Sequence, residues 1–549
     1  MHNNNIQKNI MYIFNDTGFG GAGQSLLDTL SEIKSEINPI VIIQAGAEVE
    51  NNFTELGIKC YRIPFATDYV KIGSAGMDKK KQDVIQSYEA ALQLLPIIQK
   101  EEIQLIHINS SVSSFAAIAA LMAHIPYIWH IRELLQEQFG CEFLNEELKI
   151  SLFQKADKRI AISDYVQKQY EKKYGLETYR LYNGLNIKRF KRDEVIREKF
   201  DKVFIAAAMI TPEKGQWDII QAAEHLVEKG HDDIKVIIVG NGSSGYVWAL
   251  NKYIKRKKLE NNIHILPFQE DLSQLRSCAS YAITSSQNEA LGRVTIEAML
   301  AGNIVIGAKS GGTTEIIGSN EEGGFLYELG NSKSLADTME RAINCTEEQK
   351  NILVCKAQKY AENTFDSKQY CVELLRIYNE TIEAFESYNY DEFLNTLKAY
   401  YTSISELKDF NRRNTEGVLY RKSALMFPVA LKWLEIRQNG HSFSEYFKQN
   451  HIHSIAIYGM GALGCRLYDE LENSDIEIRY LLDKNPNGMD KIFEFSWLDS
   501  LELDADAIVV TVILSEKQII SEIKKLGYDN VIGLSTVIDS LVYNMSGKG

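Results

Sequence analysis

The alternation of short apolar segments with longer amphipathic segments constrains the fold of this chain more than any other feature. In the first 131 residues, several apolar runs have the length of buried strands, and segments with helical spacing, such as 24–34 and 83–99, lie between them. The strands are expected at 10–14, 40–43, 105–108 and 127–131. Strands that alternate with helices form parallel sheets covered by helices. The pattern therefore predicts an α/β fold built from βαβ units.

The same pattern restarts twice farther along the chain. After residue 202, further apolar runs are each followed by a helical stretch, at 203–209, 236–239, 263–266, 281–284 and 304–307. A third α/β pattern runs from Ile455 to about Ile538. We therefore expect α/β domains at 1–196 and 197–366, a crossover helix and helical connector at 367–450, and a small α/β domain at 451–549.

Composition narrows the class of protein. The chain has 549 residues, of which 45% are hydrophobic and 24% are charged, as in a soluble globular protein. Its net charge of −14 argues against a nucleic-acid partner. The 7 cysteines form no CxxC pair and fit a reducing compartment. Without a signal-peptide layout or an apolar run of about 18 residues, we expect a cytoplasmic protein with at most peripheral contact at the inner face of a membrane.

Two glutamates, Glu289 and Glu297, flank the start of a predicted helix that follows the strand at 281–284. Glu297 lies in an otherwise apolar helix, where a buried carboxylate needs hydrogen-bond donors, and ribose hydroxyls are such donors. The start of a helix offers N–H groups and a positive dipole end to phosphate. The residues expected to hold a nucleotide there are Ala290, Leu291, Gly292, Arg293 and Val294. The alternative is an exposed Glu289 and a Glu297 paired with a core arginine.

Three further loops follow strands of the same predicted sheet. One carries Lys214, which can reach a phosphate as a flexible point charge. Another carries Gly242, and a third spans residues 308–315. Parallel strands bring their carboxyl ends to one edge, where open α/β sheets bind ligands. The loops therefore predict a nucleotide crevice.

Together these motifs resemble the retaining glycosyltransferases of family 4, which have the GT-B fold. The central match is the pair of glutamates in NEALGRVTIEAMLAG, and the resemblance covers roughly residues 10–385. The supporting matches are the glycine loop 18–23, the histidine in WHIRE at 129–133, the Asn-Gly segment at 182–186 and the crossover helix after Ser367.

The resemblance implies a role for each matching residue. Glu297 is expected to hold the ribose of a nucleoside diphosphate sugar, Glu289 to contact the transferred sugar and Lys214 to neutralise the diphosphate. Among the N-terminal residues, His130 is expected near the reacting carbon, Gly20 and Gly21 at the donor or acceptor, and Asn183 at the donor or in the interdomain turn.

The expected reaction is a retaining hexosyl transfer to a glycan, lipid-linked or protein acceptor in glycan or cell-envelope synthesis. The residues around the glutamates contain no Asp-x-Asp pair after a strand, so neither a metal ion nor another cofactor is expected. The family usually has an arginine where Met209 stands. Either Arg132, Arg293 or another cation replaces it, or donor binding is weak. The rival hypothesis is a non-catalytic scaffold that binds partners through its last domain.

A second glycine motif opens the last α/β pattern. Gly459, Gly461 and Gly464 form GxGxxG after a strand, and Asp483 ends the next strand nineteen residues after Gly464. This spacing is typical of dinucleotide binding. The roughly 90 residues that remain are enough for only about half of a full dinucleotide fold, and the segment resembles the small Rossmann-like modules appended to sugar-modifying enzymes. The alternative to nucleotide binding is a structural or homo-oligomerising role. A third hypothesis makes this module a redox enzyme with a bound dinucleotide.

Overall fold

The computed structural model describes residues 7–15, 20–74, 77–192, 201–386, 390–405, 429, 432–433, 436–437, 439–486, 489–493, 495 and 503–546. The chain forms two compact units. The first contains Met1–Ala208, Glu213–Val239 and Asn262–Asp409, and the second contains Met209–Pro212, Gly240–Asn261 and Phe410–Gly549.

The N-terminal half of the first unit is a parallel sheet with the strand order β3-β2-β1-β5-β6-β8-β9. The strands are β1 (Lys8–Phe14), β2 (Ile37–Gln44), β3 (Lys59–Ile63), β5 (Leu105–Ile108), β6 (Tyr127–Ile131), β8 (Lys158–Ala161) and β9 (Tyr179–Arg180). The helices are α1 (Gly21–Ile33), α2 (Glu50–Thr54), α3 (Met77–Lys100), α4 (Ser114–Ala123), α5 (Leu135–Phe139), α6 (Glu146–Lys155), α7 (Asp164–Tyr174) and α8 (Ile187–Phe190). A short antiparallel pair, β4 (Tyr69–Lys71) and β7 (Cys141–Phe143), lies outside the sheet. All four predicted strands are present.

A second parallel sheet follows in the same unit, with the order β12-β11-β10-β13-β14-β15. Its strands are β10 (Val203–Ala207), β11 (Lys235–Val239), β12 (Ile263–Leu266), β13 (Tyr281–Thr284), β14 (Ile304–Ala308) and β15 (Gly324–Tyr327). Its helices include α9 (Gln216–Glu228), α11 (Ser273–Cys278), α12 (Arg293–Leu300), α13 (Gly311–Ile317), α14 (Ser332–Asn344) and α15 (Glu347–Thr364). The predicted strand 203–209 is two residues too long, because β10 ends at Ala207; Ile210 beyond it forms an isolated bridge with Gly242. The α/β fold class with its parallel sheets is confirmed.

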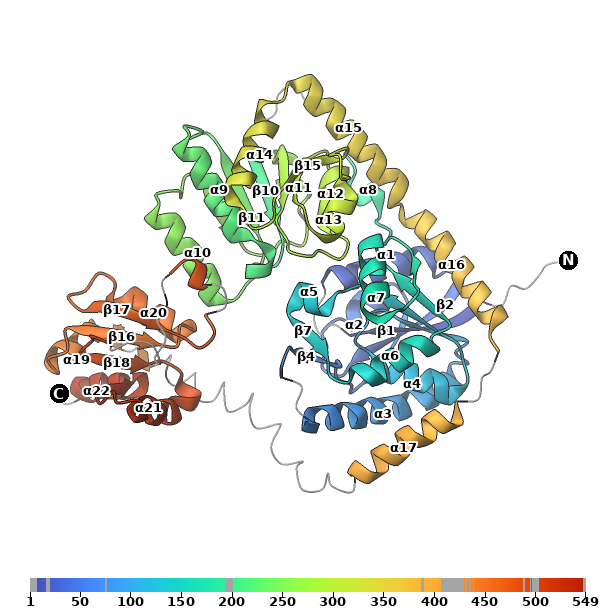
Figure 1. The fold of residues 1–549 in the computed structure, drawn as a ribbon, viewed down its shortest axis with the longest axis horizontal. Coiled ribbons are helices and arrows are strands. Elements are labelled where there is room, and N and C mark those ends of the chain that lie inside the picture. The colour runs from blue at the N-terminus through green and yellow to red at the C-terminus, as the bar shows by residue number, and fades with distance from the viewer. Residues whose placement is uncertain are drawn as a thin grey trace. The chain divides into compact units, whose positions relative to one another are not determined.

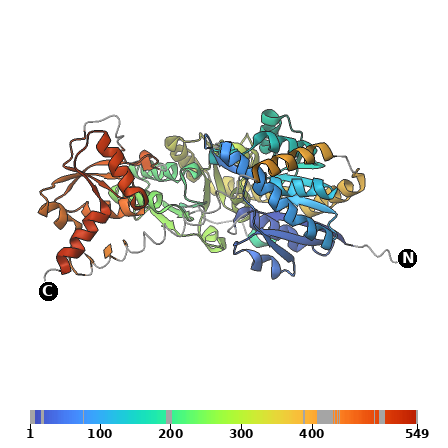
Figure 2. The same cartoon turned by 90° about the horizontal axis from the view of Figure 1, so that it is seen from below.

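The crossover helix α16 (Ser367–Ala384) returns from the second sheet to the first. Tyr370, Leu374 and Tyr378 are buried in the same core cluster as Ile10 and Tyr12 of β1. The next helix, α17 (Asp391–Ser405), packs beside α3 in both views of the ribbon (Figures 1 and 2). A distant part of the chain therefore completes the N-terminal half.

The second unit has a four-stranded parallel sheet with the order β17-β16-β18-β19. Its strands are β16 (Ser454–Tyr458), β17 (Glu477–Leu482), β18 (Ala507–Val510) and β19 (Val531–Gly533). Helices α19 (Phe443–Gln449), α20 (Ala462–Leu471), α21 (Glu516–Lys525), α22 (Leu534–Ser546) and α10 (Ser244–Arg256) complete it. Among the described helices, none is both long and apolar enough to cross a membrane.

Candidate functional site

Glu297 is the centre of a buried ion cluster on α12. One carboxylate oxygen accepts a hydrogen bond from Arg276 Nη2 at 2.6 Å, and the other accepts one from Arg293 Nε at 2.8 Å. Burial acts to raise the pKa of Glu297, but Arg276 and Arg293 together hold that pKa below its ordinary value. The structure thus shows the core-arginine partnership that the sequence left as the alternative. A ribose would have to share or replace one of these partners.

Arg293 extends the cluster to the N-terminal half of the unit. Its Nη2 donates to Asp28 of α1 at 2.8 Å. Its remaining terminal nitrogen, Nη1, is buried and has no hydrogen-bond partner among the described residues. Leaving a buried charged donor unsatisfied costs about 1–3 kcal/mol or more. This nitrogen is therefore suited to an anionic ligand.

Glu289 and Lys214 form a separate ion pair, with Lys214 Nζ 2.8 Å from the Glu289 carboxylate. The Lys214 side chain is 22% exposed and the Glu289 side chain is 19% exposed, so water and ligands reach them. Lys214 lies in a one-turn 3₁₀ helix, Pro212–Lys214, after β10, and Glu289 lies in the loop after β13. Adjacent strands thus bring two residues that the sequence separates widely into direct contact.

The glycines around α12 allow the backbone to approach closely. Gly292 caps the helix with φ +90°, a conformation that glycine adopts readily. Gly312 of α13 donates its N–H to the Glu289 carbonyl at 2.7 Å, and a Cβ on Gly312 would lie 2.7 Å from the Leu291 carbonyl oxygen. The Ala290 carbonyl accepts a hydrogen bond from the Ser163 hydroxyl at 2.5 Å. The loop before α12 is therefore held firmly, while Val294 lies in the first turn of the helix.

His130 lies at the end of β6 and is fully buried. Its Nδ1 is 3.1 Å from His107 Nε2 and 3.3 Å from Arg132 Nη2, whereas its Nε2 has no hydrogen-bond partner among the residues the structure describes. Burial, with the neighbouring charge of Arg132, holds the pKa of His130 well below its ordinary value. Arg132 Nη1 also donates to the Asn183 side-chain oxygen at 2.9 Å. His130 and Asn183 thus belong to one polar cluster.

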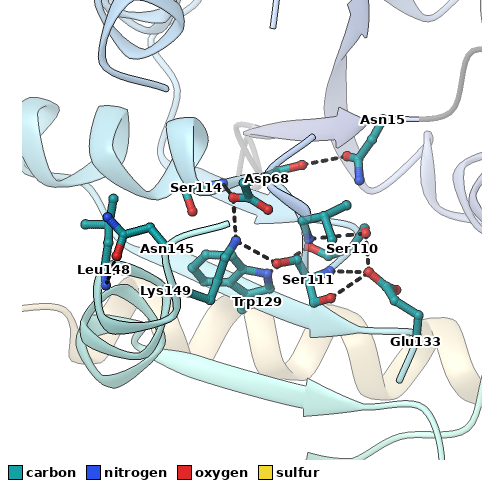
Figure 3. A network of polar contacts seen from close by, with 12 residues as sticks. Asn15, Asp68, Ser110, Ser111, Ser114, Trp129, Glu133, Asn145, Leu148 and Lys149 are labelled. Carbon is teal, nitrogen blue, oxygen red and sulfur yellow. Dashed lines mark hydrogen bonds and ion pairs between the residues drawn. The ribbon is translucent and has the colours of Figure 1, made fainter. Parts of the chain in front are cut away.

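Polar side chains line the carboxyl edge of the first sheet near His130. Glu133, after β6, accepts hydrogen bonds from the Ser110 and Ser111 hydroxyls and from the Ser111 N–H. Lys149 of α6 is buried between Asp68, at 2.6 Å, and the Ser111 carbonyl, at 2.7 Å, as Figure 3 shows. These contacts hold the loops after β5 and β6 in place.

The remaining predicted residues lie elsewhere. Gly20 occupies the N-cap position of α1, where no side chain hydrogen-bonds to the first turn of the helix. A Cβ on Gly20 or Gly21 would meet nothing within 4 Å. Residues 16–19 of that predicted loop lie outside the described residues. Gly242 belongs to the second unit, where a Cβ on it would lie 2.3 Å from the Ile210 carbonyl oxygen. Glycine at this position allows the two loops to touch.

The GxGxxG loop of the second unit opens α20 as predicted. Gly459 has φ +96°, and a Cβ on Gly464 would lie 2.1 Å from the Gly459 carbonyl oxygen. Asp483 accepts the Met460 N–H at 2.6 Å, so its carboxylate is engaged by the loop itself. The glycines thus have structural reasons to be present. Dinucleotide binding at Gly461 and Asp483 stays a prediction.

Helix α10 packs on this loop within the second unit. A Cβ on Gly245 would lie 3.3 Å from the Met460 carbonyl oxygen, and Trp248 donates to Asp469 of α20 at 2.8 Å. Lys252 pairs with Asp469 at 2.8 Å, and the Trp248 ring stacks on Phe493 at 5.3 Å between centroids.

Several site residues escaped sequence inspection. Arg276 and Asp28 hold Glu297 and Arg293, and His107 contacts His130. Arg276 and Asp28 sit on ordinary amphipathic helices, so only tertiary structure reveals them. His107 offered one clue, since it interrupts an apolar strand. Within the described ranges, no three His, Cys, Asp or Glu residues gather so as to hold a metal ion; the expectation that no metal is needed remains a prediction.

Two parallel sheets joined by a returning crossover helix, with the candidate site at their carboxyl edges, define the GT-B class of glycosyltransferases. Residues 19–189 match the model of Glycosyltransferase Family 4, and residues 187–359 match that of Glycosyl transferases group 1. The chain belongs to these glycosyltransferases. The predicted family membership and the GT-B fold are confirmed.

Known relatives are distant. Spore coat protein SA of Bacillus subtilis is 21% identical over 52% of this chain and 80% of its own length. The N-acetyl-alpha-D-glucosaminyl L-malate synthase of Bacillus anthracis is 26% identical over 30% of this chain and 42% of its own length. The capsular polysaccharide biosynthesis glycosyltransferase CapM of Staphylococcus aureus is 25% identical over 37% of this chain and 54% of its own length. The chain thus spans about half the length of the latter two.

Solved structures share the fold of the first part of the chain. Anabaena HepE, solved with UDP and glucose, has a TM-score of 0.56 and 22% identity, covering 68% of this chain and all of that protein. TarM has a TM-score of 0.55 and 14% identity over the same share of this chain and all of its own. At these identities the likeness concerns the fold.

Proposed function

We propose that this chain moves a sugar, with retention of configuration, from a nucleoside diphosphate sugar to a glycan, lipid-linked or protein acceptor. The solved relative with UDP and glucose supports a nucleotide-sugar donor. The relative named for capsular polysaccharide biosynthesis supports a glycan acceptor. The donor is assigned to the second sheet and the acceptor to the first.

One observation carries the proposal: a buried guanidinium N–H of Arg293 is unpartnered within the described residues, beside Glu297 at the start of α12. The diphosphate is the ligand that this nitrogen, Lys214 and the N–H groups of the helix start suit best. Met209 is 60% exposed where the family has an arginine. We assign the missing charge to Arg293, because Arg132 is already bound to Asn109 and Asn183.

Each charged residue then has a distinct task in the proposed reaction. Negative charge develops on the leaving diphosphate, and fixed cations stabilise it without reorganisation. Lys214 must leave the Glu289 carboxylate, at least in part, to reach a phosphate. Glu289 is thereby freed to accept hydroxyls of the transferred sugar. The acceptor attacks from the side of the leaving group, in a site from which closure removes water.

Titration calorimetry with UDP, GDP, ADP and uridine tests the proposal. We expect one nucleoside diphosphate to bind with 1:1 stoichiometry and uridine to bind far more weakly, because it lacks the charge that Arg293 and Lys214 recognise. A panel of nucleotide sugars should then show slow hydrolysis of the matching donor. If no nucleotide binds to the folded protein, the assignment of this site is wrong.

The exposed Met209 also favours a second candidate, a non-catalytic scaffold with a glycosyltransferase fold. Both glutamates have protein partners, as a scaffold would require. A scaffold predicts neither donor hydrolysis nor transfer to any acceptor. Turnover of a nucleotide sugar therefore separates the two candidates directly.

A further inference from the structure

The imidazole of His130 presents one unused hydrogen-bonding group in an otherwise complete chain of contacts. Its Nδ1 faces His107 and Arg132, at 3.1 and 3.3 Å. Its Nε2 is buried and has no partner within the described part of the chain. What this nitrogen offers to a ligand depends on which nitrogen carries the proton, and the neighbours determine that.

Arg132 fixes the tautomer of His130. A guanidinium has only N–H donors, so a ring nitrogen that contacts it must accept. His130 Nδ1 therefore carries a lone pair, and in the neutral ring the proton resides on Nε2. The same lone pair faces His107 Nε2, which must then be protonated and donate to it. A charged His130 would instead place an N–H against Arg132.

The series of hydrogen bonds continues from His107 to Tyr378 of the crossover helix α16. His107 Nδ1 is left with a lone pair and accepts from the Tyr378 hydroxyl at 2.5 Å. The Tyr378 oxygen in turn accepts from the Tyr12 hydroxyl at 2.9 Å. Burial lowers the pKa of His107 to about 3 and raises the pKa of both tyrosines, so all of them stay neutral near pH 7. In this series of hydrogen bonds each donor has an acceptor, except the Nε2–H of His130, which has none within the described residues.

We propose that Tyr378 and Tyr12 are positioning residues for glycosyl transfer: through His107 they act together with Arg132 to hold His130 as a neutral imidazole whose Nε2–H donates to an oxygen of the bound nucleotide sugar. This inference rests on the proposed function. Tyr378 lies on α16, beyond residue 359 where the family match ends. The helix that returns to the first sheet thus supplies part of the site, besides closing the fold.

The tautomers can be measured without any ligand. Full-length protein labelled with ¹⁵N-histidine is examined by long-range ¹H–¹⁵N correlation, with His130→Gln and His107→Gln used to assign the two rings. Both rings should carry their proton on Nε2 and stay neutral from pH 8 down to pH 5. A proton on Nδ1 of His130, or a positive charge on that ring at pH 7, would overturn the inference.

Kinetics test the role in transfer. Tyr378→Phe removes only the hydroxyl that donates to His107 Nδ1, so the His107 ring is no longer held in one tautomer. We expect kcat for donor turnover to fall about tenfold, with KM changed much less. Tyr127→Phe is the matched control: Tyr127 is a buried phenol on the strand of His130, but its hydroxyl donates to the Leu152 carbonyl at 2.6 Å. It should leave both kcat and the tautomers unchanged.

Conservative replacement of His107 gives a second comparison. His107→Gln keeps an N–H donor where Nε2 stood, whereas His107→Leu keeps only volume, so the glutamine variant should retain more activity. If Tyr378→Phe behaves like Tyr127→Phe while the parent turns over donor, the positioning role is wrong and the proposed function stands. If the parent neither binds nor hydrolyses any nucleotide sugar, the proposed function fails, and the role in transfer fails with it whatever the tautomers are.

Discussion

The first unit contains two buried ion clusters that differ in the kind of polar atom they leave without a hydrogen-bond partner within the described residues, an acceptor in one and a donor in the other. Lys149 holds Asp68 and the Ser111 carbonyl, and its ammonium lies 4.7 Å from the centre of the Trp129 ring. All these groups belong to the N-terminal half. The other cluster joins Glu297, with its two arginines, to Asp28, and it leaves one guanidinium nitrogen without a partner within the described residues.

This difference separates a structural role from a binding role. The Lys149 cation is surrounded by groups that attract it, and the atom that its ion pair leaves without a partner within the described residues is an acceptor, Asp68 Oδ1, which an anionic ligand would not approach. The Arg293 cluster keeps an unused donor next to a helix start, which is a cost that a bound anion would repay. The comparison teaches that burial of charge alone is a poor guide to function, and that the unsatisfied donor is the informative atom.

Removing the central cation of the first cluster should have the largest effect. Lys149→Met leaves the buried carboxylate of Asp68 without its counter-ion, which should lower the free energy of unfolding by about 3–5 kcal/mol. Lys155→Met, on the same helix, is the control, because among the described residues the Lys155 ammonium contacts only Ser151 at 3.0 Å and the Phe393 ring. Urea unfolding measures both. Nucleotide affinity per folded molecule should stay the same, and loss of it would contradict the structural assignment.

Glu297→Gln should lower both stability and binding, because it removes the buried counter-charge of Arg276 and Arg293. Replacing a charged acceptor by a neutral one should weaken nucleoside diphosphate affinity by about 1.5–3 kcal/mol, which is roughly ten- to hundredfold. Glu289→Gln is the matched comparison, since it should lower kcat more than it changes affinity for the bare nucleotide. Calorimetry and donor hydrolysis on both folded variants separate these effects. If both variants behave like the parent, the site lies elsewhere.

Arg293→Lys should sharpen the assignment of the unused nitrogen. Lysine keeps the charge beside Asp28 and Glu297 but loses the planar fork, so the diphosphate loses one hydrogen bond. We expect UDP affinity to fall by about tenfold or less, with uridine affinity unchanged. Arg276→Lys is the control: its guanidinium binds the other Glu297 oxygen. That variant should lose stability without altering the preference for UDP over uridine.

Much of the fold was predictable from sequence, because buried parallel strands are continuous apolar runs. The strands at 105–108, 127–131, 263–266 and 281–284 have the predicted limits. The edge strand β3, with the sequence KCYRI, was not predicted. Its residues are mostly charged, polar or only partly buried, so it lacks the continuous apolar run of a central parallel strand. The short β9 was missed for its length.

The candidate site was predictable only where a motif is local. Glu289, Glu297 and the helix start lie within nine residues of one another, so one segment reveals them. The partners of these residues come from other elements. Arg276 lies 21 positions before Glu297 and Asp28 lies 265 positions before Arg293. Such pairs are properties of the packed sheets, and no spacing rule applies to them.

A pH-dependent effect is expected at Asp83, which lies beside the Lys149 cluster and is 4% exposed. Burial and the neighbouring charge of Asp68 raise the pKa of Asp83 to about 7, against the attraction of Lys149. The folded protein therefore binds this proton more tightly than the unfolded chain does, whose aspartates titrate near about pH 4. Stability from this group is complete below that pH and is lost as the pH rises through 7.

Asp83→Asn cannot ionise and should therefore be more stable than the parent at pH 8, by about 1–2 kcal/mol, with little difference near about pH 4. Urea unfolding at both pH values measures this. Asp233→Asn is the control of opposite sign, because Asp233 is exposed and Lys202 lowers its pKa. That variant should lose a little stability at pH 8. If Asp83→Asn shows the same stability difference from the parent at both pH values, the Asp83 carboxyl is ionised in the folded protein and the Lys149 cluster has one more charge than we assign to it.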